Sequence, residues 1–579
     1  MEPLSSFIIK TTPERFDAIV VGSGITGGWA AKELTERGLK TLMVERGRPV
    51  EHGVGYIGEN RDPWTMPNRG KVDAQVAQEQ YAIQRQCYAF DEHTQQFFNN
   101  DRDMPYSTPA DRPFSWIRGN QLGGKSLMWA RQSYRWSDLD FEANLKDGHG
   151  NDWPIRYADL APWYSHVERH AGISGSKEGL AVLPDGEFLP PFEFNAVELA
   201  FKQKFDARYA PARMIMGRTA NLNRATAAHL EQGRVQCQAR SQCARGCSFG
   251  AYFSTQSSTL PAALKTGRLR IATNSIVHSV IYDPKTNRAT GVRVIDAETM
   301  ETREYHARVV MLCASTLAST AILLNSTSSA FPTGLANSSG VLGHYLTDHL
   351  WAAGADGRVE GFENEYYQGR RPTGAYIPRF RNVVDKHPLF TRGYALAGGA
   401  AREGWQAAAG KPGFGKEYKA MIRKPGPWRF GLHGQGEMLP RFENAVSLHP
   451  TRKDKWGMPL LHIDASHCDN DRKMREDMAD TAANILEYLG VKDVRKTIAT
   501  AEEYPPGLAI HEMGTARMGR DPKTSVLNGF NQAHDVPNLF VTDGASMASG
   551  AWQNPSLTFM ALTARASAYA VDEMKAGRI

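Results

Sequence analysis

Three of the six cysteines stand close together, at positions 237, 243 and 247 of the segment CQARSQCARGC. Their spacing, C-x5-C-x3-C, lacks the paired C-x2-C or histidine partners of four-ligand zinc sites. A disulfide would leave one thiol over, whereas three thiolates suit an iron–sulfur cluster with one vacant corner. From the spacing alone, a three-iron cluster and simple reduced thiols stay as alternatives for Cys237, Cys243 and Cys247.

A glycine-rich turn lies near the start of the chain, in FDAIVVGSGITGGWAAKELTERGLKTLMVERG. The pattern predicts a strand over 18–21, a helix after the turn and a second strand ending at Glu45. In this βαβ context, Gly22, Gly24 and Gly27 are typical of a dinucleotide site with the pyrophosphate on the helix N-terminus. Glu45 is placed to accept hydrogen bonds from both ribose hydroxyls, which disfavours a 2′-phosphate. The motif predicts FAD or NAD.

Other elements that would position a cofactor come much later in the chain. Residues 304–326 predict a buried strand, a small-residue turn and a helix, a second place where backbone can approach a cofactor. Residues 536–574 predict a short strand that ends at Asp543-Gly544 and a helix that begins near Asn554-Pro555, since proline suits a first helical turn.

Together these motifs resemble the glucose–methanol–choline (GMC) family of FAD-dependent alcohol oxidoreductases. The resemblance rests on the glycine motif with Glu45, GNQLGGKSLMW, DWPIRYADLAPWY, HEMGTARMG and TDGASMASGAWQNPSLTFMAL, which follow the family order over residues 17–570. It implies an α/β fold in which a Rossmann-like FAD-binding domain carries a substrate domain of antiparallel sheet covered by helices. Only residues 350–500 are without a family motif.

The resemblance also implies catalytic residues. In the family, a hydride passes from a carbinol carbon to the flavin, and a histidine with a second histidine or an asparagine faces the flavin N5 edge. Carried over, His511 is the base and Asn554 its partner. A neutral imidazole can take the hydroxyl proton, and the amide of Asn554 can hold the substrate oxygen. The alternative is a capped loop histidine and a helix N-cap asparagine.

Further cofactor contacts follow from the same resemblance. Beside the glycines and Glu45, they are Arg46, Gly123, Gly124, Ser126, Val277, Asp543, Gly544, Asn554 and Pro555. Some members attach FAD covalently through a histidine in the segment that matches GGKSLMW. The matching residue here is Met128, which implies non-covalent FAD.

Within the family, the cysteine spacing resembles that of the FAD-dependent glucose dehydrogenase of bacterial three-subunit complexes. This implies a [3Fe-4S] cluster on Cys237, Cys243 and Cys247, and a dehydrogenase that delivers electrons to a partner. It also implies a small signal-bearing subunit, a cytochrome c or quinone acceptor, and a periplasmic or membrane-associated location through that subunit. Without a partner, a cytoplasmic location is expected.

The segment GGKSLMWARQSYRWSDLDFEAN resembles glucoside 3-dehydrogenases. The expected reaction is therefore oxidation of a secondary ring hydroxyl of a sugar or glycoside, at C-3, to a 3-keto glycoside. Gln435, His433 and Tyr367 are expected substrate contacts, since a sugar site needs aromatic faces and hydrogen-bonding groups. The alternatives are an oxygen-using pyranose or glycoside oxidase, a gluconate or polyol dehydrogenase, and an electron-transfer flavin scaffold without its own substrate.

The bulk properties narrow the partners and the organisation. The 68 Lys and Arg against 62 Asp and Glu give a net charge of +6 without a long basic run, which argues against nucleic acid. We see no signal-peptide pattern and no run of 18 apolar residues, so we expect no direct membrane span. We expect an FAD domain from 1–60, 110–345 and 500–579, and a substrate domain from 61–109 and 346–499.

Overall fold

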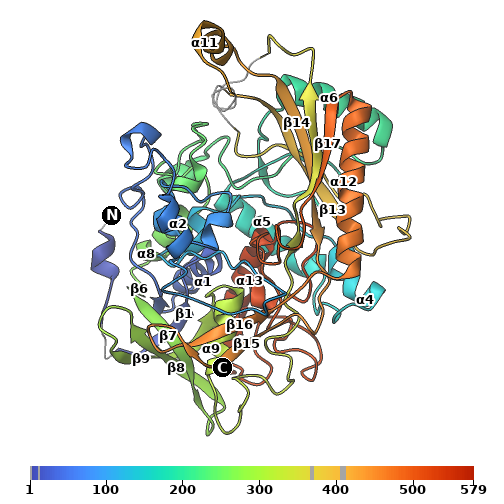
Figure 1. The fold of residues 1–579 in the computed structure, drawn as a ribbon. Coiled ribbons are helices and arrows are strands. Elements are labelled where there is room, and N and C mark those ends of the chain that lie inside the picture. Colours follow the sequence, from blue (N-terminus) through green and yellow to red (C-terminus); the bar gives the residue numbers. More distant parts are fainter. Residues whose placement is uncertain (1–2, 11–13, 366–370, 405–411) are drawn as a thin grey trace.

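The computed structural model describes residues 3–10, 14–365, 371–404 and 412–579. Within these ranges, two seven-stranded sheets organise the chain, one at the lower left of Figure 1 and one at the upper right. The chain passes from one sheet to the other several times, so each is built from segments far apart in sequence. The expected α/β fold, with a mostly parallel sheet and a separate antiparallel one, is confirmed.

The first sheet has the strand order β6-β2-β1-β9-β8-β7, with β18 beside β9. Its strands are β1 (Phe16–Val21), β2 (Thr41–Val44), β6 (Leu269–Ala272), β7 (Ser275–Asp283), β8 (Arg288–Asp296), β9 (Thr302–Leu312) and β18 (Leu539–Val541). β1 pairs in parallel with β2 and β9. Its Ala18 and Val20 pack in one core cluster and Ile19 and Val21 in another, because neighbouring side chains point to opposite faces of a doubly covered sheet.

The helices on this sheet bring the two ends of the chain together. They are α1 (Ile25–Glu36), α5 (Tyr157–Ala171), α9 (Thr316–Asn325) and the C-terminal α13 (Ser556–Lys575). α1 packs against α13, which also contacts α5 (Figure 1). The strand, turn and helix predicted for residues 304–326 are confirmed as β9 and α9. The βαβ unit and the C-terminal helix α13 therefore lie side by side.

The second sheet is antiparallel, in the order β17-β11-β14-β13-β12-β5, with β10 beside β14. Its elements are β5 (Ile215–Met216), β10 (His349–Leu350), β11 (Ala353–Val359), β12 (Ala375–Ile377), β13 (Tyr394–Arg402), β14 (Trp428–Glu437), β17 (Lys492–Ile498) and the covering helix α12 (Asp469–Leu489). Gly434 and Gly436 leave room on β14 for Met474 and Met478 of α12, because a Cβ at either glycine would overlap these side chains. The opposite face of β14 is free to carry Gln435 toward the first sheet.

The second sheet includes residues that the sequence boundaries assign to the FAD domain. α6 (Ala196–Tyr209) and β5 lie on it, and Phe201, Phe205 and Met214 join its core. The physical reason is that the apolar side of α6 meets β13 and α12 rather than the parallel sheet. The division into five sequence ranges stays a prediction.

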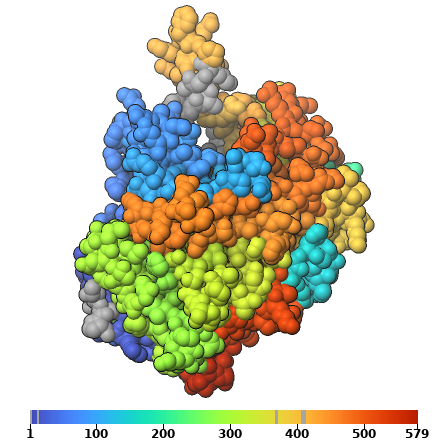
Figure 2. Space-filling view, turned by 60° about the horizontal axis from the view of Figure 1, so that its bottom comes forward, coloured from blue at the N-terminus to red at the C-terminus, as the bar shows by residue number. Residues whose placement is uncertain are grey.

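The remaining elements cover the edges. They are the hairpin of β15 (Ala445–Lys453) and β16 (Pro459–Asp464), the short pair β3 (Ile173–Ser174) and β4 (Phe188–Leu189), and the helices α2 (Ala74–Gln80), α3 (Asp138–Phe141), α4 (Ala143–Asp147), α7 (Ala227–Glu231), α8 (Leu260–Lys265) and α11 (Gly415–Arg423). Figure 2 shows α11 standing out from the body of the molecule. Among the described residues, no helix combines the length and the apolar character that crossing a membrane requires.

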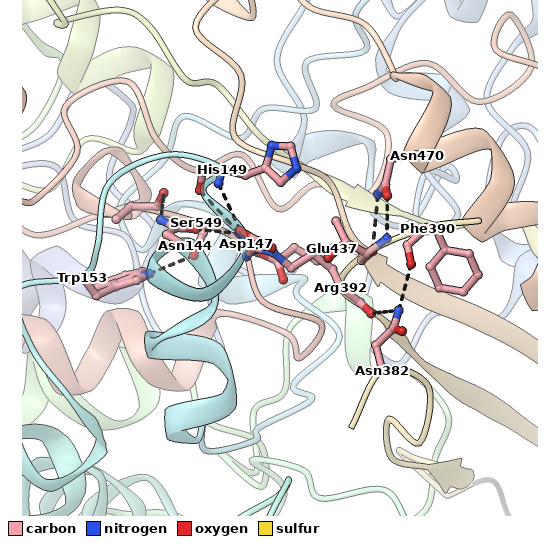
Figure 3. A network of polar contacts seen from close by, with 12 residues as sticks. Asn144, Asp147, His149, Trp153, Asn382, Phe390, Arg392, Glu437, Asn470 and Ser549 are labelled. Carbon is pink, nitrogen blue, oxygen red and sulfur yellow. Dashed lines mark hydrogen bonds and ion pairs between the residues drawn. The ribbon is translucent and has the colours of Figure 1, made fainter. Parts of the chain in front are cut away.

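A buried arginine joins the second sheet to the loops of the first (Figure 3). The Arg392 guanidinium donates to Glu437 Oε1 at 2.6 Å, to Asn144 Oδ1 at 2.8 Å and to Asp147 Oδ1 at 2.9 Å. Asn144 in turn donates to the carbonyl of Ala548 at 3.1 Å. The chain that leads to Asn554 is therefore tied to β14 through this network.

Candidate active site

A cavity of about 840 Å³ lies where the parallel strands end and the second sheet begins. Residues directly after β1, β2, β9 and β18 line it, together with the segment 124–132, Gln435 of β14, the loop 508–512 and residues 554–556. Because ligands of open α/β sheets bind beyond the carboxyl ends of the strands, this is the place where a dinucleotide is expected.

The glycine motif forms one end of the cavity. Gly22 has a φ of +94°, and a Cβ there would meet the Cys313 carbonyl at 2.5 Å. A Cβ at Gly27 would overlap the Gly22 carbonyl, whereas a Cβ at Gly24 would have no atom within 4 Å. Gly24 is the N-cap of α1 and makes no side-chain cap bond, so the helix presents free N–H groups to the open space. This arrangement fits a pyrophosphate.

Glu45 follows β2 and lines the same end. Its carboxylate accepts from Ser23 N at 3.1 Å, from Ser23 Oγ at 2.5 Å and from Gly47 N at 2.8 Å. Three of the roughly four acceptor positions of a carboxylate are thus occupied, which leaves capacity for a ribose hydroxyl. Burial raises the pKa of Glu45, and the three donors oppose that rise. Arg46 beside it is held by Asp454, at 3.1 Å.

The structure brings the other predicted cofactor residues to this cavity as well. Arg46, Gly124, Ser126, Val277, Asp543, Gly544, Asn554 and Pro555 all line it, and so does Met128. Gly123 lies just behind the wall, where its N–H donates to Ser23 Oγ at 2.8 Å. Burial raises the pKa of Asp543 to about 6, although Ser319 donates to its carboxylate at 2.5 Å. Met128 has no imidazole ring, so it cannot form the covalent bond that joins a histidine to a flavin.

His511 lies at the other end of the cavity, between two nitrogen-bearing side chains. Its Nδ1 is 3.0 Å from His349 Nδ1, and its Nε2 is 3.4 Å from Asn554 Nδ2. His349 Nε2 lies 3.0 Å from the carbonyl of Ala551. Asn554 is 7% exposed, and its Oδ1 has no partner among the described residues. The predicted base and its amide partner are therefore adjacent and face the same open space.

Burial keeps both imidazoles neutral. It holds the pKa of His511 well below the usual 6.5, and His349 and Lys125 lower it further. Burial also lowers the pKa of His349 to about 4. A neutral imidazole is the form that can accept a proton, so His511 is ready to act as a base across the neutral range.

A buried carboxylate holds the loop that carries His511. Asp348 precedes β10 and accepts from the backbone N–H groups of Gly507 at 2.7 Å, Ala509 at 3.2 Å and His511 at 3.0 Å. Burial raises the pKa of Asp348 to about 7, with Glu512 contributing. The three hydrogen bonds place the loop independently of any contact to its side chains.

The expected substrate contacts have different outcomes. Gln435 lines the cavity, is 3% exposed, and its Nε2 has no partner within the described ranges. His433 lies on the same face of β14 but does not line the cavity. Tyr367 lies outside the described residues. Gln435 thus has a donor available for a ligand, and His433 has no such position.

The three clustered cysteines lie outside the cavity, in the irregular segment that follows α7. Each is a free thiol of intermediate exposure. In the part of the chain that the structure describes, no group of three or more His, Cys, Asp or Glu side chains is placed to hold a metal ion. The [3Fe-4S] cluster expected on these residues is therefore without support from the described structure.

Sequence reasoning missed several residues of the site. His349 and Asp348 were available as the acid–histidine pair in TDHLW, at the edge of the stretch without family motifs. Tyr376 also lines the cavity with a hydroxyl that lacks a partner among the described residues. No sequence signal could have found Tyr376, because an aromatic residue on a strand is ordinary core composition.

Comparison with known proteins agrees with this site. Residues 16–351 and 440–563 match two models described as GMC oxidoreductase. The chain is 29% identical over 591 residues to 2-methyl-1,2-propanediol dehydrogenase of Mycolicibacterium austroafricanum, covering 97% of this chain and 96% of that protein. It is 25% identical over 568 residues to the fructose dehydrogenase large subunit of Gluconobacter japonicus, covering 97% and 98%.

A solved structure, pyridoxine 4-oxidase from Mesorbium loti, has the same fold, with a TM-score of 0.61 at 18% identity over 96% of this chain and 99% of that one. The N-terminal family match alone, residues 16–351, spans more than half of the 579 residues. With the glycine motif, Glu45, His511 and Asn554 gathered around one cavity, the chain belongs to the GMC oxidoreductase family.

Proposed function

We propose that this protein is an FAD-dependent dehydrogenase that oxidises a secondary ring hydroxyl of a sugar or glycoside, at C-3, to a 3-keto glycoside. The observation that carries the proposal is the pair of His511 Nε2 and Asn554 Nδ2, 3.4 Å apart on the wall of the cavity that begins at the glycine motif. The similarity to a fructose dehydrogenase large subunit supports a sugar as substrate.

The chain's own residues would hold FAD without a covalent bond. The free N–H groups of α1 would bind the pyrophosphate, and Glu45 a ribose hydroxyl. Asp543 and Gly544 line the same cavity as these groups and His511. When bound, FAD supplies the acceptor for a hydride from the carbinol carbon.

His511 would take the hydroxyl proton at Nε2, because both its burial and the charge of Lys125 keep the imidazole neutral. The Nδ2 of Asn554 would donate to the substrate oxygen, which orients the alcohol and stabilises its developing negative charge. Gln435 Nε2 and the Tyr376 hydroxyl have no partner in the described structure and supply further hydrogen bonds that a polyhydroxylated ring can satisfy.

For the electron acceptor, we propose an external partner, a cytochrome c or a quinone, and a small signal-bearing subunit that gives a periplasmic location. The similarity to a protein named a large subunit supports this. A [3Fe-4S] cluster on Cys237, Cys243 and Cys247 is part of this proposal and is carried by the spacing of the three residues. Iron analysis of purified protein tests it: about three iron atoms per chain would support the cluster, and iron-free, fully active enzyme would contradict it.

The test of the proposed function is anaerobic. Purified holoenzyme is mixed with a panel of mono- and disaccharides, flavin bleaching is followed in a stopped-flow instrument, and the products are identified by NMR. We expect a sugar to bleach the flavin and to be converted to a keto product. We expect the bleaching to be lost in His511→Gln. His306→Gln, on the half-exposed start of β9, is the matched control. Dye reduction without oxygen consumption separates the dehydrogenase from an oxidase, and absence of bleaching by every sugar and diol contradicts the proposal.

A second candidate is oxidation of a small diol. It is favoured by the 29% identity over 97% of the chain to 2-methyl-1,2-propanediol dehydrogenase. Adding small diols to the same panel separates the two, because only one class will bleach the flavin at low concentration.

A further inference from the structure

The proposed base has a second histidine directly behind it. His511 Nδ1 and His349 Nδ1 are 3.0 Å apart, and the two rings are nearly perpendicular, at 86°. His349 is 1% exposed, and its Nε2 forms a hydrogen bond with the Ala551 carbonyl at 3.0 Å. The four groups form one line from a backbone carbonyl, through His349 and His511, to Asn554.

The Ala551 carbonyl, at one end of this line, determines which ring nitrogen of His511 carries a hydrogen. A carbonyl oxygen can only accept, so His349 Nε2 carries a hydrogen and donates it to Ala551. A neutral imidazole with a hydrogen on Nε2 has a bare Nδ1, which can only accept. His511 Nδ1 must then be the donor in the bond between the rings, and His511 Nε2 is left with its lone pair.

The amide of Asn554 is consistent with this assignment. A bare His511 Nε2 is an acceptor, so Asn554 must turn its Nδ2 toward it, 3.4 Å away. Its Oδ1 then points away and has no partner among the described residues.

The charged groups around the pair favour two neutral rings. Lys125 lowers the pKa of His511, and its Nζ is 3.2 Å from Glu512 Oε2. The carboxylate of Asp348 is engaged by backbone N–H groups, including that of His511, rather than by either ring. Protonation of His349 would make both Nδ1 atoms donors, and the bond between the rings would be lost.

We propose that His349 and the Ala551 carbonyl form a tautomer relay that keeps the proton of neutral His511 on Nδ1 and leaves Nε2 bare for the substrate hydroxyl. His349 is thus a positioning residue for the proposed oxidation, and the inference rests on that proposed function. The relay ends at a carbonyl that cannot take up a proton, so the proton abstracted at Nε2 leaves again through Nε2 and the cavity.

The first test is independent of activity. In holoenzyme with ¹⁵N-labelled histidine, ring nitrogen shifts distinguish a protonated nitrogen from a bare one, and the His511 signals are identified by their loss in His511→Gln. We expect protonated Nδ1 and bare Nε2 in the wild type. A wild-type signal with bare Nδ1 overturns the relay, whether or not a substrate is known.

The second test compares two replacements of His349. Asn places an acceptor oxygen near the position of Nδ1, whereas Leu fills the space without an acceptor. We expect His349→Leu to mix the His511 tautomers and to slow flavin reduction about 10–100-fold, with His349→Asn recovering most of the loss. His467→Leu, at another buried histidine, is the control. Equal rates and unaltered ¹⁵N signals in Leu and Asn variants overturn the relay, whereas a wild type that no alcohol reduces contradicts only the proposed function.

Discussion

At the scale of single residues, the site depends on which nitrogen carries a hydrogen. His511 offers the proposed acceptor of the proton and Asn554 the proposed donor to the oxygen, 3.4 Å apart. Neither residue type is unusual, and both functions follow from burial and from the absence of competing partners. Among the residues that the structure describes, Asn554 Oδ1 has no partner, so this atom makes no hydrogen bond that would hold the fold.

Replacing Asn554 by Leu tests this view. The branched shape is kept but the donor is lost, so we expect the rate of flavin reduction at saturating alcohol to fall about 100-fold, as for removal of one donor to a developing oxyanion. The thermal midpoint should stay close to that of the wild type. Stopped-flow reduction and a melting curve measure both, and a rate within twofold of the wild type would contradict the role of the amide.

At the scale of elements, the turn from β1 into α1 contains two glycines whose surroundings differ. Gly24 opens to the cavity, whereas Gly27 has the Gly22 carbonyl where a Cβ would be. Asp348 holds the loop at 507–511 by accepting hydrogen bonds from its backbone N–H groups. The His511 ring is not used to hold the loop and contacts His349 instead.

Gly24→Ala and Gly27→Ala are therefore a matched pair. For Gly24→Ala we expect stability within about 1 kcal/mol of the wild type and FAD binding weakened at least about tenfold, since the methyl group fills space that the pyrophosphate needs. For Gly27→Ala we expect a loss of about 1–3 kcal/mol in the free energy of unfolding, from overpacking. Apoprotein denaturation and FAD titration measure the two quantities. If both variants changed FAD affinity and stability in the same way, the distinction between the two glycines would be wrong.

At the scale of the whole molecule, the two sheets are joined by the network in Figure 3. Arg392 has a side chain only 2% exposed, and Glu437 only 1%. Removing one member leaves a buried charge without its partner. Because the network reaches Ala548, it also connects the second sheet with the chain that carries Asn554.

Arg392→Met should lower the free energy of unfolding by about 3–5 kcal/mol, because Glu437 then remains buried and unpaired. The double variant with Glu437→Leu should recover much of this loss, since it also removes the more deeply buried of the two carboxylates that pair with Arg392. Urea denaturation followed by fluorescence compares the three proteins. A single variant as stable as the wild type would mean that the network contributes little.

The buried histidines predict a loss of stability in acid. Burial, with nearby arginines, lowers the pKa of His467 from 6.5 to about 3. Between these two values the unfolded chain binds a proton that the folded protein does not, so stability falls as the pH falls below 6.5. His467 alone contributes about 3 kcal/mol to this loss by pH 4. Denaturation at pH 7 and pH 4.5 should show a smaller difference in His467→Leu, and an unchanged difference would contradict the assignment.

The sequence by itself was sufficient to predict the residues that line one part of the candidate site. Gly22, Gly24, Gly27 and Glu45 act through local geometry: a tight turn, a helix start and a strand end within thirty residues. Such short-range patterns leave a direct trace in the chain. Residues 543–555 were recognisable for the same reason, because they directly join a short strand, β18, to a helix, α13.

Only the tertiary structure decided which residues meet across long distances. His349 contacts His511 across 162 positions, and its type carried no spacing that could reveal the contact. Conversely, the tight spacing of Cys237, Cys243 and Cys247 implied a ligand set, but spacing limits only how far apart three thiols can lie. Whether they converge depends on how the backbone between them turns, and that is set by packing against the rest of the protein.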